Sequence, residues 1–150
     1  MVNSKFMKIN FRAIVKEDYD FLWQLHNAAL REYVEKTWGW NEDWQKQNFA
    51  ANFNPGDGVI IVYENEDVGF LWKIEKGNEI LLASIRILPE YQNKGIGTKI
   101  IKDLLASSNK NVRLQVLKVN PARNLYARLG FVIKDETDTH FVMERKSTDD

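Results

Sequence analysis

The strongest constraint on the fold is a strand, a tight turn and a helix that follow one another between residues 80 and 107. Residues 80–88 form an apolar run typical of a buried strand, and apolar residues between 100 and 105 recur on one helical face. The polar turn between them contains Gly95 and Gly97. Such a turn directs unpaired backbone N–H groups, at the positive end of a helix dipole, into one small volume. We therefore predict an anion site in this turn, with a phosphate as its ligand.

Composition limits the class of protein. The chain has 150 residues and no cysteine, so we expect one domain over residues 1–146, a disordered tail at 147–150 and no disulfide framework. With only two histidines, we expect no metal site. No apolar run approaches the ~18 residues that a membrane-spanning helix needs. Because the first residues lack the apolar core of a signal peptide, we expect a cytoplasmic protein.

Charge is unevenly distributed, although the net charge is zero. Between residues 91 and 130, eight basic residues stand against one acid, Asp103. Solvated helix faces are the simplest explanation, but the overlap with the glycine turn favours a polyanionic ligand. DNA or RNA is a competing ligand. We expect no nucleic-acid partner, because the rest of the chain is acidic and contains no recognised nucleic-acid-binding module.

Apolar periodicity and turn residues predict the order of helices and strands. The predicted elements are a strand at 8–14, a helix opened by Glu17 and Asp18 and broken by Gly39, a helix capped by Asn41 that runs to about Phe53, strands at 59–63, 68–74 and 80–88, a helix to about Ser107, a strand at 112–119, a helix at 122–129 and strands at 131–134 and 140–145. The turn between the strands at 59–63 and 68–74 is expected at residues 64–67, and the strand at 140–145 is expected to close the sheet. The order β-α-α-β-β-β-α-β-α-β-β predicts an α/β (α+β) fold, with a mixed sheet and helices on both of its faces.

The glycine turn differs from two common phosphate loops. A P-loop places four residues between its glycines, whereas Ile96 alone separates Gly95 from Gly97. The dinucleotide fingerprint requires a third glycine where this chain has Ile100. A turn that binds no ligand remains an alternative. The pattern that fits is Gln-x-x-Gly-x-Gly, beginning at Gln92, and a second motif lies at residues 120–131, Asn-Pro-Ala-Arg-Asn-Leu-Tyr-Ala-Arg-Leu-Gly-Phe.

These two motifs, in this order, resemble the acetyl-CoA signature and the Asn…Ala-x-x-Leu-Tyr-x-x-x-Gly-Phe segment of the GCN5-related N-acetyltransferase (GNAT) superfamily. The resemblance extends along nearly the whole chain. It implies a GNAT-like, mostly antiparallel twisted sheet of about seven strands with four helices, and acetyl-CoA as co-substrate without a metal. The residues it assigns to coenzyme A are Ile85, Arg86, Ile87, Gln92, Asn93, Lys94, Gly95, Ile96, Gly97, Thr98 and Asn120.

The resemblance also implies how the chain binds this co-substrate. Backbone N–H groups of residues 93–98 would bind the pyrophosphate, with side-chain contacts from Lys94 and Thr98. The main chain of residues 85–87 would bind the pantetheine arm and the acetyl carbonyl, and Asn120 would contact the cofactor farther along.

Tyr126 is the catalytic residue that the resemblance implies, as the general acid that protonates the departing thiolate. A phenol with a pKa of about 10 is protonated at neutral pH. The alternative is a core tyrosine that only packs. A general base is harder to assign, because Gln115 stands where some relatives carry a glutamate. The remaining carboxylates considered are Glu32, Glu35, Glu42 and Glu79, each of which also fits an ordinary surface charge, and water is a further proton acceptor.

The acceptor site is expected in the link between the first two helices. Trp38 and Trp40, beside Glu35 and Glu42, would bind a cationic amine through ring faces and carboxylates. The alternative is that the tryptophans pack this joint against the sheet, with Trp44 as the core residue.

These observations favour an N-acetyltransferase in which a primary amine attacks acetyl-CoA directly. The alternative is a non-catalytic acyl-CoA-binding or regulatory domain. The expected partner is a small-molecule or peptide amine, with no nucleic acid and no membrane, and the protein is expected to be a monomer or a homodimer.

Overall fold

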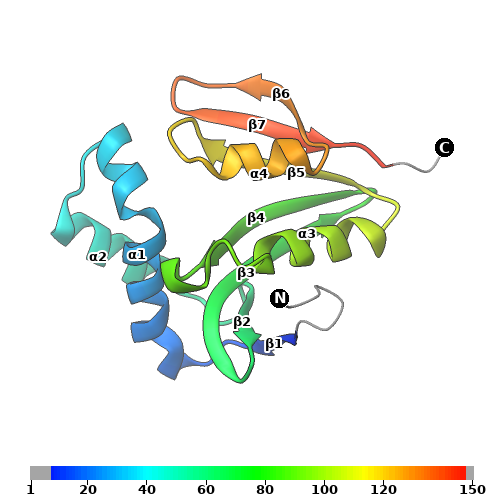
Figure 1. The fold of residues 1–150 in the computed structure, drawn as a ribbon. Coiled ribbons are helices and arrows are strands. Elements are labelled where there is room, and N and C mark those ends of the chain that lie inside the picture. The colour runs from blue at the N-terminus through cyan, green and yellow to red at the C-terminus, as the bar shows by residue number, and fades with distance from the viewer. Residues whose placement is uncertain (1–7, 148–150) are drawn as a thin grey trace. The chain divides into compact units, whose positions relative to one another are not determined.

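The structure, a computed structural model, describes residues 8–147 and contains the elements that the sequence predicts, in the predicted order (Figure 1). Residues 148–150 of the expected tail lie outside the described residues. The elements are β1 (Ile9–Ala13), the 3-10 helix η2 (Lys16–Asp18), α1 (Tyr19–Thr37), α2 (Glu42–Asn52), β2 (Val59–Tyr63), β3 (Glu66–Lys76), β4 (Glu79–Ile87), the 3-10 helix η3 (Pro89–Tyr91), α3 (Ile96–Ala106), β5 (Asn111–Leu117), α4 (Ala122–Arg128), β6 (Val132–Glu136) and β7 (His140–Arg145).

The strands form one hydrogen-bonded sheet in the order β1-β2-β3-β4-β5-β7-β6. Pairs β1–β2, β2–β3, β5–β7 and β6–β7 are antiparallel, while β4 and β5 are parallel. The predicted mostly antiparallel sheet of about seven strands with four α-helices is therefore confirmed.

The described residues divide into two compact units, through both of which β3 and β4 run. The first unit comprises the described residues up to Trp72 together with Ile85–Gln92. The second unit comprises Lys73–Ser84 together with the described residues from Asn93 on.

The first unit buries an apolar cluster under α1. Leu22 and Leu25 of α1 are buried with Ile14 and Ile60, and aromatic side chains of α1 and α2 pack against this cluster. Two of the aromatic residues packed against the cluster, Phe49 and Phe53, also meet the ring of Tyr19 edge to face, with centroids 5.3 and 5.1 Å from it. Burial of these side chains is the main favourable contribution to the stability of the unit.

The hairpin between β2 and β3 is tighter than predicted. Glu64 and Asn65 both have positive φ angles, 50° and 69°, and Tyr63 pairs with Glu66. A two-residue loop with this conformation matches the twist of the flanking strands. As a result β3 begins at Glu66, two residues before the predicted start at Val68.

Helix α2 confirms one prediction and corrects another. The side chain of Asn41 accepts a hydrogen bond from the backbone N–H of Trp44 at 2.9 Å, as an N-cap does. Trp44 itself is 57% exposed, so its expected place in the core is wrong. Gln45 and Phe49, one helical turn apart, form the buried and half-buried face of α2. Trp44 precedes Gln45 by one residue, about 100° around the helix, and therefore faces solvent.

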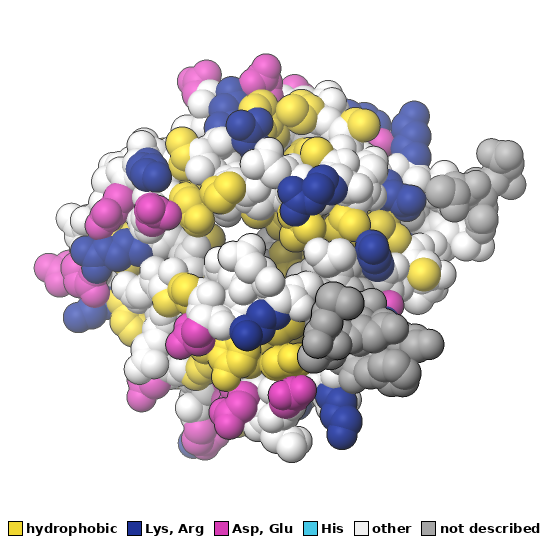
Figure 2. Space-filling model, viewed as in Figure 1, with side chains coloured by type: hydrophobic (Ala, Val, Ile, Leu, Met, Phe, Trp, Pro, Cys, Tyr) yellow, Lys and Arg dark blue, Asp and Glu magenta, His cyan; other side chains and the backbone are white. Residues whose placement is uncertain are grey.

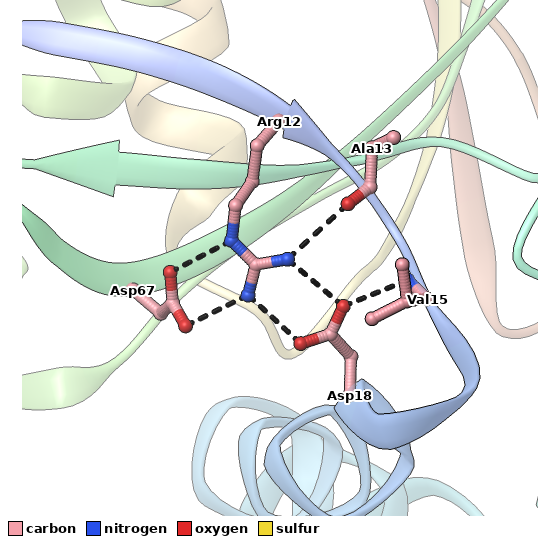
Figure 3. Close-up of polar contacts among 5 residues, drawn as sticks. All are labelled: Arg12, Ala13, Val15, Asp18 and Asp67. Carbon is pink, nitrogen blue, oxygen red and sulfur yellow. Dashed lines mark hydrogen bonds and ion pairs between the residues drawn. The ribbon is translucent and has the colours of Figure 1, made fainter.

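Arg12 links three segments of the first unit (Figure 3). Its Nε and Nη2 donate to the two oxygens of Asp67 at 3.2 and 2.8 Å, and its Nη1 and Nη2 donate to Asp18 at 2.9 and 2.8 Å. Asp18 also accepts from the N–H of Val15 at 2.9 Å. These bonds hold the pKa of Asp18 below its usual value, chiefly through the contact with Arg12. The cluster ties β1 to β3 and to the start of α1.

In the second unit, α3 presents an apolar face, and β5 and β7 contribute buried side chains. The buried apolar residues of this unit are Ile80, Leu82, Ile96, Ile100, Ile101, Leu104, Val112, Leu114, Val116, Tyr126, Phe131 and Met143. Strand β7 lies between β5 and β6 and does not close the sheet as expected. The hairpin pairs β6 with β7, and β6 becomes the edge, which agrees with the exposure of all its residues.

Over residues 8–147, the structure contains no helix with the length and apolar character required to cross a membrane.

Candidate functional site

The glycine turn adopts a conformation that glycine favours. Asn93 and Gly95 have φ angles of 63° and 86°, both in the left-handed region. Gly95 stands immediately before the first residue of α3. A side chain at that position would be strained, whereas glycine adopts the conformation at little cost.

The backbone N–H groups of this turn are unpaired. No hydrogen bond among the described residues uses the N–H of any of residues 93–98 as a donor, and the first bond of α3 runs from Lys99 N–H to Gly95 C=O at 2.9 Å. No side chain caps the helix. The turn therefore presents a run of donors at the positive end of α3, as an anion site requires.

Side chains around the turn are mostly exposed. Asn93 and Lys94 face solvent, and Thr98 is half-buried. In the first unit, the Gln92 amide Nε2 donates to the backbone C=O of Ile87 at 2.8 Å. This bond spans η3 and fixes the end of β4 relative to the start of the turn.

The other two predicted site residues of the second unit lie at α4. The Asn120 side-chain oxygen accepts from the N–H of Ala122 at 2.9 Å, which leaves the amide nitrogen of Asn120 without a partner among residues 8–147. Tyr126 is 8% exposed, its ring centroid is 5.9 Å from that of Phe131, and burial raises the pKa of Tyr126 to about 12. The Tyr126 hydroxyl makes no hydrogen bond with any described residue. Among the described residues, Arg113 Nε is the one fully buried side-chain nitrogen or oxygen without a hydrogen bond, so the Tyr126 oxygen is not fully buried. The tip of the phenol therefore reaches the surface, and it is protonated at neutral pH.

Residues 85–87 belong to the first unit, and all three are half-buried. The main chain of β4 approaches β3 closely here. Leu88 N–H donates to Val68 C=O at 2.8 Å, and a Cβ added to Gly69 would collide with the backbone oxygen of Arg86. Glycine at position 69 therefore sets where Arg86 lies.

Near the predicted acceptor site, the carboxylates already pair with a basic side chain of the chain itself. Arg31 bonds Glu35 at 2.9 Å, and its guanidinium lies 5.2 Å from the ring centroid of Trp40. Glu42 accepts from the indole N–H of Trp40 at 2.7 Å. Trp38 is 62% exposed. The structure thus brings Glu35, Trp40 and Glu42 together around Arg31, which occupies the ring face predicted for a cationic amine.

The carboxylates considered as a general base are all paired. Glu32 lies 3.8 Å from Lys36, and Glu79 lies 3.4 Å from Arg113. Gln115 is exposed. Among residues 8–147, no group of three or more histidine, aspartate or glutamate side chains is arranged to hold a metal ion.

The structure adds a polar group that the sequence does not indicate, formed by His26, Gln45 and Arg86 of the first unit. His26 Nε2 lies 3.0 Å from Gln45 Oε1, and Arg86 Nη1 lies 3.2 Å from His26 Nδ1. The pKa of His26 is lowered, first by burial and also by the charge of Arg86, against the opposing effect of the bond to Gln45. Burial lowers the pKa of Arg86 to about 10. Sequence spacing gives no signal for this group, because 60 residues separate His26 from Arg86.

Half of the eight basic residues in the basic segment pair with a carboxylate within the second unit. The basic residues of this segment that pair with a carboxylate are Lys99, Lys110, Arg113 and Lys118. On the face drawn in Figure 2, Lys and Arg side chains are spread among side chains of other kinds and do not gather in one patch. Lys94, in the glycine turn, is exposed and makes no ion pair with a described residue.

A family model described as an acetyltransferase (GNAT) domain matches residues 55–133. Two curated relatives of Mus musculus also match. The cysteine-rich protein 2-binding protein is 31% identical over 97 residues, which are 60% of this chain and 12% of that protein. Thialysine N-epsilon-acetyltransferase is 39% identical over 66 residues, which are 41% of this chain and 39% of that protein. The matches therefore span well under half the length of these relatives.

Among solved structures, the PaiA N-acetyltransferase of Thermoplasma acidophilum, in complex with coenzyme A, is similar over nearly the whole chain. The TM-score is 0.75 at 19% sequence identity, and the alignment covers 93% of this chain and 99% of that one. At this identity, the similarity is one of fold.

Proposed function

The chain belongs to the GNAT acetyltransferase family, and from this membership we propose that it transfers the acetyl group of acetyl-CoA to a primary amine. The observation that carries the proposal is the run of unpaired backbone N–H groups over residues 93–98 at the start of α3. These donors bind the pyrophosphate of coenzyme A, with Lys94 and Thr98 beside them. The main chain of residues 85–87 binds the pantetheine arm and the acetyl carbonyl, and the free amide nitrogen of Asn120 donates to the cofactor.

The reaction we propose is direct attack. The amine nitrogen forms a bond to the acetyl carbon, and backbone N–H groups near Ile87 stabilise the negative charge on the carbonyl oxygen. The carbon–sulfur bond then breaks, and the Tyr126 hydroxyl gives its proton to the departing thiolate. The proton lost by the amine passes to water, because the carboxylates considered as a base are paired with basic residues.

The acceptor is a small-molecule or peptide amine that enters beside Trp38 and Trp40, near the carboxylates of Glu35 and Glu42, which stay paired with Arg31. A primary amine at the end of a side chain fits the proposal, since a matching relative is named for acetylation of thialysine at its ε nitrogen. The working location of the enzyme is the cytoplasm, and it acts as a monomer or a homodimer without a metal.

The test is acetyl-CoA turnover over a panel of amines, read by release of the coenzyme A thiol. In Tyr126→Phe, kcat for the best acceptor should fall about 100-fold or more, as expected for loss of a general acid, with unchanged affinity for acetyl-CoA. Tyr19→Phe is the matched control, because Tyr19 contributes ring contacts in the first unit and should keep full activity.

A specific observation keeps a second function open. The absence of an unpaired carboxylate among the base candidates is compatible with a non-catalytic acyl-CoA-binding or regulatory domain. Acetyl-CoA binding without turnover of any amine by the wild-type protein would favour this second function. Unchanged kcat in Tyr126→Phe would instead remove the tyrosine from the mechanism.

A further inference from the structure

Arg86 is a partly buried cation that lacks a carboxylate partner in the described part of the chain. Its one hydrogen bond runs from Nη1 to His26 Nδ1, and its guanidinium carbon lies 5.9 Å from the ring centroid of Phe70. Buried guanidinium groups are usually paired with anions, because removing a charge from water is costly. The lowered pKa of Arg86, about 10, reflects that cost. The side chain nevertheless remains charged at neutral pH.

The free edge of this guanidinium is accessible. Nε and Nη2 of Arg86 make no hydrogen bond with residues 8–147, and Arg113 Nε is the sole fully buried side-chain nitrogen or oxygen there without a hydrogen bond. Nε and Nη2 of Arg86 therefore retain contact with solvent. These two nitrogens form the planar edge that binds a carboxylate through two parallel hydrogen bonds.

His26 and Gln45 hold this edge in place. An arginine only donates, so His26 Nδ1 accepts, and the ring proton is on Nε2, where it bonds Gln45 Oε1. Gln45 is buried, with 9% of its surface exposed. The chain from Gln45 through His26 to Arg86 is thus fixed in one orientation. The rings of Trp23 and Trp40 lie 5.8 and 5.7 Å from that of His26 and provide an apolar wall beside it.

We propose that the Nε–Nη2 edge of Arg86 binds a carboxylate of the acceptor, so that the substrates of this enzyme are amines that also carry a carboxylate, such as amino acids or peptides with an acidic group. The inference rests on the proposed function and specifies its substrate class. Arg86 then serves both ligands, with its main chain toward the cofactor and its side chain toward the acceptor. A phosphate fits less well, because no second unpaired basic side chain among the described residues contacts this group.

The test compares acceptors that differ in the presence of a carboxylate, namely lysine with lysinamide and alanine with alaninamide. For the best pair, wild-type kcat/KM should be about tenfold to hundredfold higher for the acid, the range of a hydrogen-bonded charge pair. In Arg86→Gln this ratio should fall to near one, because loss of the carboxylate contact lowers kcat/KM for the acid alone, whereas any change at the acetyl-CoA site lowers kcat/KM for acid and amide alike. Arg86→Lys keeps the charge without the planar edge and should restore part of the ratio.

Arg128→Gln is the matched control, because Arg128 is exposed on α4 and makes no ion pair with a described residue. It should keep the wild-type ratio. Equal kcat/KM for acid and amide in the wild type, or a preference that survives Arg86→Gln, would overturn the inference and leave the acetyltransferase proposal intact.

If no amine is acetylated, the proposed function fails, and binding alone decides the inference. Sodium acetate is then titrated into the wild-type protein while the His26 ring resonances are followed by nuclear magnetic resonance. A saturable shift that is absent in Arg86→Gln would support an anion site at Arg86. No saturable shift in the wild type would exclude it.

Discussion

Arg12 and Arg86 belong to the same unit and have opposite surroundings. Arg12 bonds two carboxylates, and its Nε–Nη2 edge is filled by Asp67 (Figure 3). The same edge of Arg86 is open, and its one polar partner is a neutral histidine. The contacts raise the pKa of Arg12, whereas burial lowers that of Arg86. Arg12 is thus a fully paired structural cation, and Arg86 is a cation whose counter-ion is missing from the described chain.

The difference separates stability from binding. A cation that is satisfied within the fold contributes to the free energy of unfolding. A cation that is left unpaired costs stability, and such a cost is expected where a ligand will supply the partner. Substitutions at the two arginines should therefore differ in how strongly they change the free energy of unfolding.

The largest effect is expected from removal of the paired arginine. Arg12→Met should lower the free energy of unfolding by about 3 kcal/mol, less than for a fully buried pair because the Arg12 side chain is 37% exposed. Arg86→Met should change it by less than about 1 kcal/mol, since the lost bond to His26 is offset by removal of an unpaired charge. Urea unfolding curves of the two variants measure both values. An equal loss in both would show that Arg86 is structural too.

A smaller effect is expected at Gly69. Gly69→Ala should lower the free energy of unfolding by about 2 kcal/mol, because the new Cβ collides with the Arg86 backbone oxygen. The displacement should also reduce the preference for acids over amides. Gly56→Ala is the control, because a Cβ there meets only Asn54 at an ordinary 3.4 Å. Loss of stability with an unchanged preference would mean that the position of Arg86 does not determine binding.

The smallest effect is a dependence of stability on pH. The pKa of folded His26 lies below its ordinary value of about 6.5, so the unfolded chain binds the extra proton first as pH falls. Stability should therefore decrease below about pH 6.5, by at most about 1.4 kcal/mol at pH 5.5. His26→Gln should abolish this decrease. Asp18 cannot cause this decrease. Because its pKa is lowered in the folded protein, Asp18 loses its stabilising contribution only in stronger acid, where the carboxylate takes up a proton. A wild-type curve parallel to that of His26→Gln between pH 7.5 and 5.5 would contradict the prediction.

The sequence predicts local features of the fold well. The cap at Asn41 and the glycine turn at Gly95 depend on residues close in sequence, and the structure confirms both. The exposure of Trp44 was not predictable, because the inward face of a short helix depends on which residues of other segments meet it. The position of β7 between β5 and β6 depends likewise on pairing between strands.

In the candidate site, too, some features depend on residues close in sequence and others on contacts between distant segments. The unpaired N–H groups of residues 93–98 follow from a local motif, so the sequence predicts where they lie. The contact between His26 and Arg86 joins residues 60 positions apart on α1 and β4, and no motif marks it. The pairing of Arg31 with Glu35 is local in sequence, but the placement of its guanidinium over Trp40 depends on how the chain turns after α1. The sequence therefore predicts the unpaired N–H groups of the turn, whereas the contacts of Arg86 and Arg31 are found only in the structure.

The donors of the glycine turn belong to the main chain, and this has a consequence for variation. Replacing Lys94 with any residue other than proline leaves every one of these N–H groups in place, provided that the left-handed conformations at Asn93 and Gly95 are kept. The arrangement of these donors then depends on the path of the main chain and on very few side chains. Chains of one fold can therefore differ at many side chains of such a turn and still present the same backbone donors.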